Sequence, residues 1–150
     1  MSENTYLLNG RFLQNLNGWT VNDPAVVYSA GDGDDHYGVA ILPTGGKSIE
    51  QAFGVQGVRL FTLHISVKAV GAVLTAGQAT LSIVDGNGNT VVTANLVAGT
   101  ADTWIETTYQ YGLAEGTTYT LRITNVNATG NIKVDDLWLW LQLIKRLARV

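Results

Sequence analysis

Eight consecutive residues in the middle of the sequence, Phe61 to Lys68, alternate between apolar and polar side chains without exception. A period of two is typical of an antiparallel β-strand that has one face buried and the other in solvent. The odd-numbered residues of this segment, Phe61 to Val67, are therefore expected to face a hydrophobic core. A strand of this kind needs neighbouring strands, so the segment predicts a sheet protein.

Other segments carry the same signature. Residues 119–124 alternate in the same way, and residues 79–96 are typical of a hairpin that turns at 85–89. The remaining expected strands, separated by turns rich in Gly, Asn or Asp, are 25–29, 38–42, 47–53, 104–111 and 131–141. A chain of 150 residues suits one core. We predict an all-β fold, a two-sheet antiparallel jelly-roll sandwich of about 8 to 9 strands.

The composition argues against several kinds of chemistry. There is no Cys, which excludes disulfides, thiolate metal ligands and a Cys nucleophile. The sequence contains no G-x-S-x-G turn, no H-E-x-x-H helix and no phosphate-binding loop, so we expect a protein that is not an enzyme. Neither histidine, His36 or His64, has a second His or a Cys beside it at metal-ligand spacing, and both are expected at the surface.

The charge distribution bears on partners. Residues 1–144 carry 6 basic and 12 acidic side chains, a net charge of −6, which argues against nucleic acid as a partner. The N-terminal residues have no basic region followed by a long apolar run, and no stretch of about 18 apolar residues exists. We therefore expect no membrane partner, and a soluble protein made in the cytoplasm without a signal peptide.

Three segments contain short motifs: Asn9-Gly10-Arg11-Phe12 followed by Gly18-Trp19, residues 116–123 with the pattern G-x-x-Y-x-L-R-I, and residues 132–137 with the pattern I-x-V-D-D-L. They resemble the N-G-x-F-E…G-W opening, the G-x-x-Y-x-L-R-I strand and the closing I-x-V-D-D-V strand of carbohydrate-binding-module-like (galactose-binding-like) jelly rolls. The resemblance extends from about residue 7 to residue 141, and we assign the jelly roll to residues 1–141. It implies that Trp19 and Trp104 lie in the core.

The same resemblance implies a structural calcium, for which this chain lacks a ligand. The family's Glu after N-G-x-F and the first Asp of its V-D-D strand often hold the ion, but here Leu13 replaces the Glu and only Asp135 remains. Hard cations prefer several oxygen ligands, so we expect no metal or other cofactor, with Asp135 as the one candidate left. The segment Asp32-Gly33-Asp34-Asp35-His36 lacks the downstream Glu of a calcium loop and is expected to be a solvated turn.

The end of the last expected strand places two tryptophans outside the core. If Leu137, Leu139 and Leu141 face inward, then Trp138 and Trp140 must face outward, because successive side chains alternate across a sheet. Two outward Trp side chains form an apolar patch of the kind found in interfaces. We therefore predict that they form an oligomer contact.

Residues 142–150 continue beyond the resemblance as an expected C-terminal arm, with a pattern that could form about two helical turns. Its apolar anchors are Leu143, Ile144 and Leu147, and its basic residues are Lys145, Arg146 and Arg149. We expect this arm to dock on a neighbouring subunit or on a capsid beneath it, with its basic residues against acidic surface. The alternative is a frayed terminus.

Two functions fit these features. The first is a capsid decoration protein on the virion of a tailed bacteriophage, a homotrimer bound to the major capsid protein; size and pattern resemble the small jelly-roll decoration proteins of thermophilic phages. The alternative is a carbohydrate-binding module that recognises a polysaccharide. For that alternative, aromatic side chains that could stack on sugar rings, if they do not simply pack in the core, are Tyr28, Tyr37, Tyr109 and Tyr111.

Overall fold

The computed structural model describes residues 6–34, 37–55, 59–114 and 118–141. Within these residues the chain forms strands joined by turns. They are β1 (Thr20–Val21), β2 (Val27–Ser29), β3 (Val39–Leu42), β4 (Lys47–Gly54), β5 (Arg59–Ala69), β6 (Ala79–Val84), β7 (Thr90–Asn95), β8 (Trp104–Leu113), β9 (Thr118–Asn125) and β10 (Ile132–Leu141).

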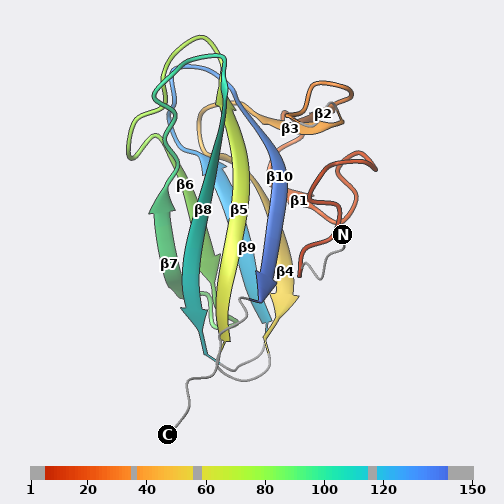
Figure 1. Ribbon diagram of the computed structural model, residues 1–150, viewed down its shortest axis with the longest axis vertical. Helices are drawn as coiled ribbons and strands as arrows, with labels where there is room; N and C mark the ends of the chain where they lie inside the picture. Colours follow the sequence, from red (N-terminus) through yellow and green to blue (C-terminus); the bar gives the residue numbers. More distant parts are fainter. Residues whose placement is uncertain (1–5, 35–36, 56–58, 115–117, 142–150) are drawn as a thin grey trace, which may run out of the picture.

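The strands form two packed antiparallel sheets (Figure 1). The front sheet, nearer the viewer in Figure 1, has the order β2-β3-β10-β5-β8, and the back sheet has the order β1-β4-β9-β6-β7. The predicted jelly-roll sandwich and all nine expected strands are confirmed. The two-residue strand β1 was not expected, because a segment that short carries no periodicity.

The core lies between the sheets and follows the alternation of the sequence. In β5 the side chains of Phe61, Leu63 and Ile65 are completely buried, and the residues between them point to the outside of the front sheet. Trp19 is buried, as expected, and its ring packs against Phe12 with the ring centroids 5.7 Å apart. Burial of these large side chains supplies the main driving force for folding.

Strand β10 contains a β-bulge that changes which residues face the core. Before the bulge the even-numbered Ile132 and Val134 are buried, and after it the odd-numbered Leu137 and Leu139 are buried. The pairing with β5 shifts between Asp135 and Trp138, as an extra residue in one strand requires. The bulge includes Asp136, whose φ of 50° is one that Asp tolerates better than most residues.

The N-terminal segment covers the edge of β10 beyond the bulge. Strand β3 pairs only with residues 132–134 of β10. Further along, the Tyr6 amide donates to the Leu139 carbonyl over 2.6 Å, and the Leu137 amide donates to the Gly10 carbonyl over 2.9 Å. A Cβ at position 10 would lie 1.8 Å from the Leu137 oxygen, so only Gly fits here.

Two side chains hold this segment in place. The Gln51 side chain, from β4 of the back sheet, accepts from the Leu8 amide over 2.6 Å and donates to the Leu8 carbonyl over 2.9 Å. The Asn9 side chain accepts from the Gln14 amide over 3.1 Å and donates to the Asn17 carbonyl over 2.8 Å, which closes the following loop. The N-terminal segment is thereby joined to both sheets.

Candidate functional site

Trp138 and Trp140 lie side by side on the outer face of the front sheet, which we call the front face. Trp138 is opposite His64 of β5, and Trp140 is opposite Thr62. Both indoles are partly exposed, and their ring centroids lie 6.4 Å apart with the planes at 87°. The predicted outward orientation is confirmed.

Polar groups surround the two indoles. Each Trp begins a row of hydrogen-bonding side chains that runs across β10, β5 and β8. One row is Trp138, His64 and Thr108, and the other is Trp140, Thr62 and Gln110. His64 Nδ1 lies 2.9 Å from the Asp136 carbonyl, and because a carbonyl oxygen only accepts, Nδ1 carries the proton. His64 Nε2 lies 3.4 Å from Glu106 Oε1 at the surface. The front face therefore combines aromatic rings with donors and acceptors.

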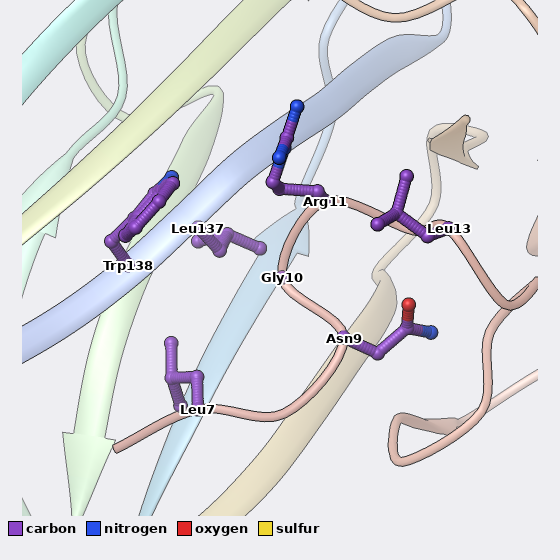
Figure 2. Close-up of a pocket in the computed structure, with 7 residues that line it drawn as sticks. All are labelled: Leu7, Asn9, Gly10, Arg11, Leu13, Leu137 and Trp138. Carbon is purple, nitrogen blue, oxygen red and sulfur yellow. The ribbon is translucent and has the colours of Figure 1, made fainter. Parts of the chain in front are cut away.

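A pocket of about 340 Å³ adjoins Trp138. Figure 2 shows it between β10 and the N-terminal loop. Its lining residues are Leu7, Asn9, Gly10, Arg11, Leu13, Leu137 and Trp138. The Arg11 guanidinium lies 5.0 Å from the centre of the Tyr37 ring, and Arg11 Nε lies 3.9 Å from Asp136 Oδ1. The pocket thus has apolar walls and a cation beside it.

The segment around residues 31–34 packs on the front face near its β2–β3 side. Ser66 Oγ donates to Asp34 Oδ2 over 3.1 Å, and Lys133 Nζ lies 2.6 Å from Asp32 Oδ2. Ser66 has no exposed surface. The described part of this segment is a turn whose two Asp residues are partly exposed, as expected, but their carboxylates also have partners on β5 and β10, which the expectation of a solvated turn did not include. Asp35 and His36 lie outside the described residues.

The donor set around Asp135 does not fit the calcium that the family resemblance implies. The Asp135 carboxylate is completely buried and accepts from the Asp34 amide over 3.0 Å and from the Asp136 amide over 2.7 Å. Leu13, in the place of the family's Glu, is 53% exposed. No group of three or more acidic, His or Cys side chains among the described residues could hold a metal ion. Backbone amides therefore satisfy this carboxylate.

Trp104 corrects another expectation. It is partly exposed and lies on the front face opposite Lys68, whose ammonium is 5.9 Å from the centre of the indole ring. The core placement predicted from the family resemblance is wrong. The sequence of β8 indicates the outward position, because side chains alternate along a strand. Trp104 is two residues from the exposed Glu106 and next to Ile105, which packs against the core.

The four tyrosines proposed as a sugar platform do not share one face. Tyr109 and Tyr111 pack against the core from the inner side of β8, stacked with ring centroids 6.1 Å apart. Burial raises the pKa of both hydroxyls, and the charge on Tyr109 raises that of Tyr111 further. Tyr28 also packs against the core, whereas Tyr37 is 51% exposed beneath Arg11.

The predicted arm lies outside the described residues, and so do all of its proposed contact residues, Leu143, Ile144, Lys145, Arg146, Leu147 and Arg149. The described part of the chain contains no helix with the length and apolar character needed to cross a membrane.

Comparison with protein-family models and with curated protein sequences found no match. Solved structures do match. The chain is similar to the carbohydrate-binding module TmCBM61, whose structure holds β-1,4-galactotriose, with a TM-score of 0.69 and 14% identity over 93% of this chain and 100% of that one. It is also similar to the CBM22-1 xylan-binding domain of Paenibacillus barcinonensis Xyn10C, with a TM-score of 0.65 and 18% identity over 88% and 91%.

A third similar structure is the enzymatically active domain of bacteriophage CBA120 tailspike protein 4, with a TM-score of 0.64 and 15% identity. This chain is 92% covered in that match but spans only 21% of the tailspike chain. At these identities the likeness defines the fold, a jelly-roll sandwich that carbohydrate-binding modules share.

Proposed function

We propose that this chain is a non-enzymatic carbohydrate-binding domain that binds a polysaccharide on the front face, at Trp138 and Trp140. The observation that supports this most is the placement of two partly exposed indoles on β10, with polar side chains on the adjacent strand and a pocket of about 340 Å³ beside Trp138. Such a combination of apolar surface and a few polar groups is typical of small-molecule sites.

The chemistry of a sugar matches this face. A pyranose ring has an apolar side of C–H groups that stacks on an indole, and hydroxyls at its rim that need hydrogen-bonding partners. Thr108 and Gln110 are exposed and lie in the rows of Trp138 and Trp140. Strand β5 lies between them and the indoles, so they can bind the hydroxyls on the far rim of a sugar ring that is stacked on the indole of the same row.

The angle between the indoles favours a particular form of ligand. Because their planes meet at 87°, the two rings do not make one flat surface. A flat crystalline polysaccharide would contact only one of them fully. A single soluble chain, whose successive sugar residues can turn relative to each other, can contact both.

The similar structures suggest which ligands to test first. One is a complex with β-1,4-galactotriose, and another is described as a xylan-binding domain. Galactan and xylan are therefore the first two polysaccharides for affinity electrophoresis in native gels, followed by titration calorimetry with oligosaccharides.

Single Trp138→Ala and Trp140→Ala variants test the site. Each should weaken polysaccharide binding about tenfold or more, because buried aromatic contacts of this kind are worth about 1.4 kcal/mol or more. Val91→Ala is the matched control, since Val91 is 48% exposed on β7 of the back sheet. If both Trp variants bind as well as the parent protein and as the control, the site lies elsewhere.

A second use of the same indoles is the contact between copies of this chain that the sequence predicts. Their partial exposure on one face favours it. Sedimentation equilibrium of the full chain distinguishes polysaccharide binding from assembly. Assembly is supported by a trimer that dissociates in the Trp138→Ala Trp140→Ala double variant and is weakened by deletion of residues 143–150. A monomer at micromolar concentration excludes it. Capsid decoration has no support among the similar structures and stays a prediction.

A further inference from the structure

Trp104, Lys68 and Lys133 form a row across three neighbouring strands of the front face. Lys68 of β5 is opposite Trp104 of β8 on one side and opposite Lys133 of β10 on the other. All three side chains are partly exposed. Facing residues on one side of an antiparallel pair have Cβ atoms about 4.5–5.5 Å apart, so the two lysines are close neighbours.

One of the two lysines in this row has no carboxylate partner among the described residues. Lys133 has a carboxylate partner, Asp32, at 2.6 Å. The Lys68 ammonium makes no ion pair with any residue in the described ranges. Its nitrogen lies 5.9 Å from the centre of the Trp104 ring. Like charges opposite each other destabilise a sheet, so an anion beside Lys68 would be stabilised there.

We propose that this row binds an acidic sugar residue, which deepens the proposed function and rests on it. The indole of Trp104 would stack on the sugar ring, while the Lys68 ammonium would pair with a singly charged group on that ring. Two groups share this chemistry, the carboxylate of a uronic acid and a sulfate ester. The ligand class is therefore an acidic polysaccharide rather than a neutral one.

The row is within reach of a chain bound at the tryptophans of β10. Thr108 lies in the row of Trp138, and Trp104 is four residues from Thr108 along β8. Four residues of a strand span about 13 Å. A polysaccharide can therefore contact Trp138 with one sugar residue and Trp104 with another.

The carboxylates on the same face restrict where the acidic group can bind. Glu106 lies between the two rows, with its side chain 63% exposed. Its carboxylate lies 3.4 Å from His64 Nε2, in the row of Trp138, and would repel an anion placed there. The carboxylates of Asp32 and Asp34 lie at Lys133 and Ser66, on the β10 side of Lys68. The favourable position for the acidic group is consequently on the β8 side of Lys68, over the Trp104 ring, and a moderately substituted chain suits it better than a fully charged one.

The test measures binding of the full chain to pairs of charged and uncharged polymers. Glucuronoxylan and pectin are each used before and after reduction of their carboxylates to alcohols, and a sulfated galactan is compared with its desulfated form. Lys68→Met keeps most of the side-chain volume and removes the charge. Lys47→Met is the matched control, because Lys47 lies on β4 of the back sheet.

We expect the parent protein to bind at least one acidic polymer about two- to fivefold more tightly than its uncharged form at low salt, the range of a partly exposed ion pair. Lys68→Met should abolish that preference, whereas Lys47→Met should keep it, and salt should reduce the preference in the parent. Loss of preference only with carboxylated polymers, or only with the sulfated one, identifies the group.

Two results would overturn the proposal. In the first, uncharged polymers bind through Trp138, but the acidic forms bind no more tightly, or their tighter binding survives in Lys68→Met. The acidic subsite is then absent, while the proposed function stands. If neither these polymers nor neutral galactan and xylan bind, both proposals fail together.

Discussion

The backbone amide of Asp34 donates a hydrogen bond to the carboxylate of Asp135, which lies 101 residues further along the chain. The second carboxylate oxygen of Asp135 accepts from the Asp136 amide, within the bulge of β10. One buried side chain thus fixes both the bulge and the segment that packs on the front face. Hydrogen bonds of this type, with a charged acceptor, are among the stronger ones in proteins.

Replacing this carboxylate should be costly. In Asp135→Asn the side chain can still accept one hydrogen bond, but its NH₂ group then faces a backbone N–H. We expect the free energy of unfolding to fall by about 2–4 kcal/mol. Urea unfolding followed by circular dichroism measures it, with Glu106→Gln as the exposed control on the same face. Equal stability of the two variants would contradict the anchoring role.

Metal removal should have no effect on stability, because backbone amides occupy the Asp135 carboxylate. A calcium ion at 100 times its dissociation constant would add about 2.7 kcal/mol, which for a chain of this size corresponds to several degrees in melting temperature. We expect the same melting temperature with EDTA and with millimolar calcium. A rise with calcium that EDTA reverses would show that the segment does hold a cation.

Gly10→Ala should loosen the N-terminal segment. The added Cβ would meet the Leu137 carbonyl oxygen, so residues 6–10 must move away from β10 and lose their hydrogen bonds. We expect a loss of about 2–4 kcal/mol in the free energy of unfolding, together with weaker polysaccharide binding, because Gly10 lines the pocket beside Trp138. Gly99→Ala, where a Cβ would meet nothing within 4 Å, is the control.

The stacked tyrosines predict how stability depends on alkaline pH. Burial raises the pKa of Tyr109 and Tyr111 in the folded chain above the ordinary value of 10.0. Above pH 10 the two hydroxyls lose their protons more readily in the unfolded chain than in the folded one. The free energy of unfolding is therefore unaffected by these groups' titration below pH 10, and it falls as the pH rises further.

Tyr111→Phe should remove much of this alkaline loss. The Tyr111 hydroxyl is buried and has no hydrogen-bond partner among the described residues, so at neutral pH the variant should be as stable as the parent or up to about 1 kcal/mol more stable. Unfolding in guanidinium between neutral and alkaline pH measures both effects. A variant clearly less stable at neutral pH would mean that this hydroxyl is bonded after all.

The sequence predicted those parts of the fold that depend on local pattern. Alternation in Phe61–Lys68 identified β5 and its buried face, and the leucines after Asp136 placed Trp138 and Trp140 on the outside. The position of Trp104 could also have been derived, because the exposed Glu106 has the same parity. The family resemblance led to the opposite conclusion.

The remaining features depend on contacts between residues distant in the sequence. Nothing near Asp32 or Asp34 indicates that their partners are Lys133 and Ser66, because the order of strands in the front sheet brings these residues together. The pocket beside Trp138 has the same origin, since one wall comes from residues 7–13 and the other from residues 137–138. Periodicity describes a strand's faces but does not identify its neighbours.

The position of β10 has a consequence for synthesis of the chain on the ribosome. Of the described strands it is made last, yet it lies in the interior of its sheet, between β3 and β5. Until it emerges, those two strands expose unpaired edges, and residues 6–10 lack the strand they cover. Such edges can pair with other nascent chains. The domain must therefore complete its fold after translation of β10, and a chain stalled before residue 132 is prone to aggregate.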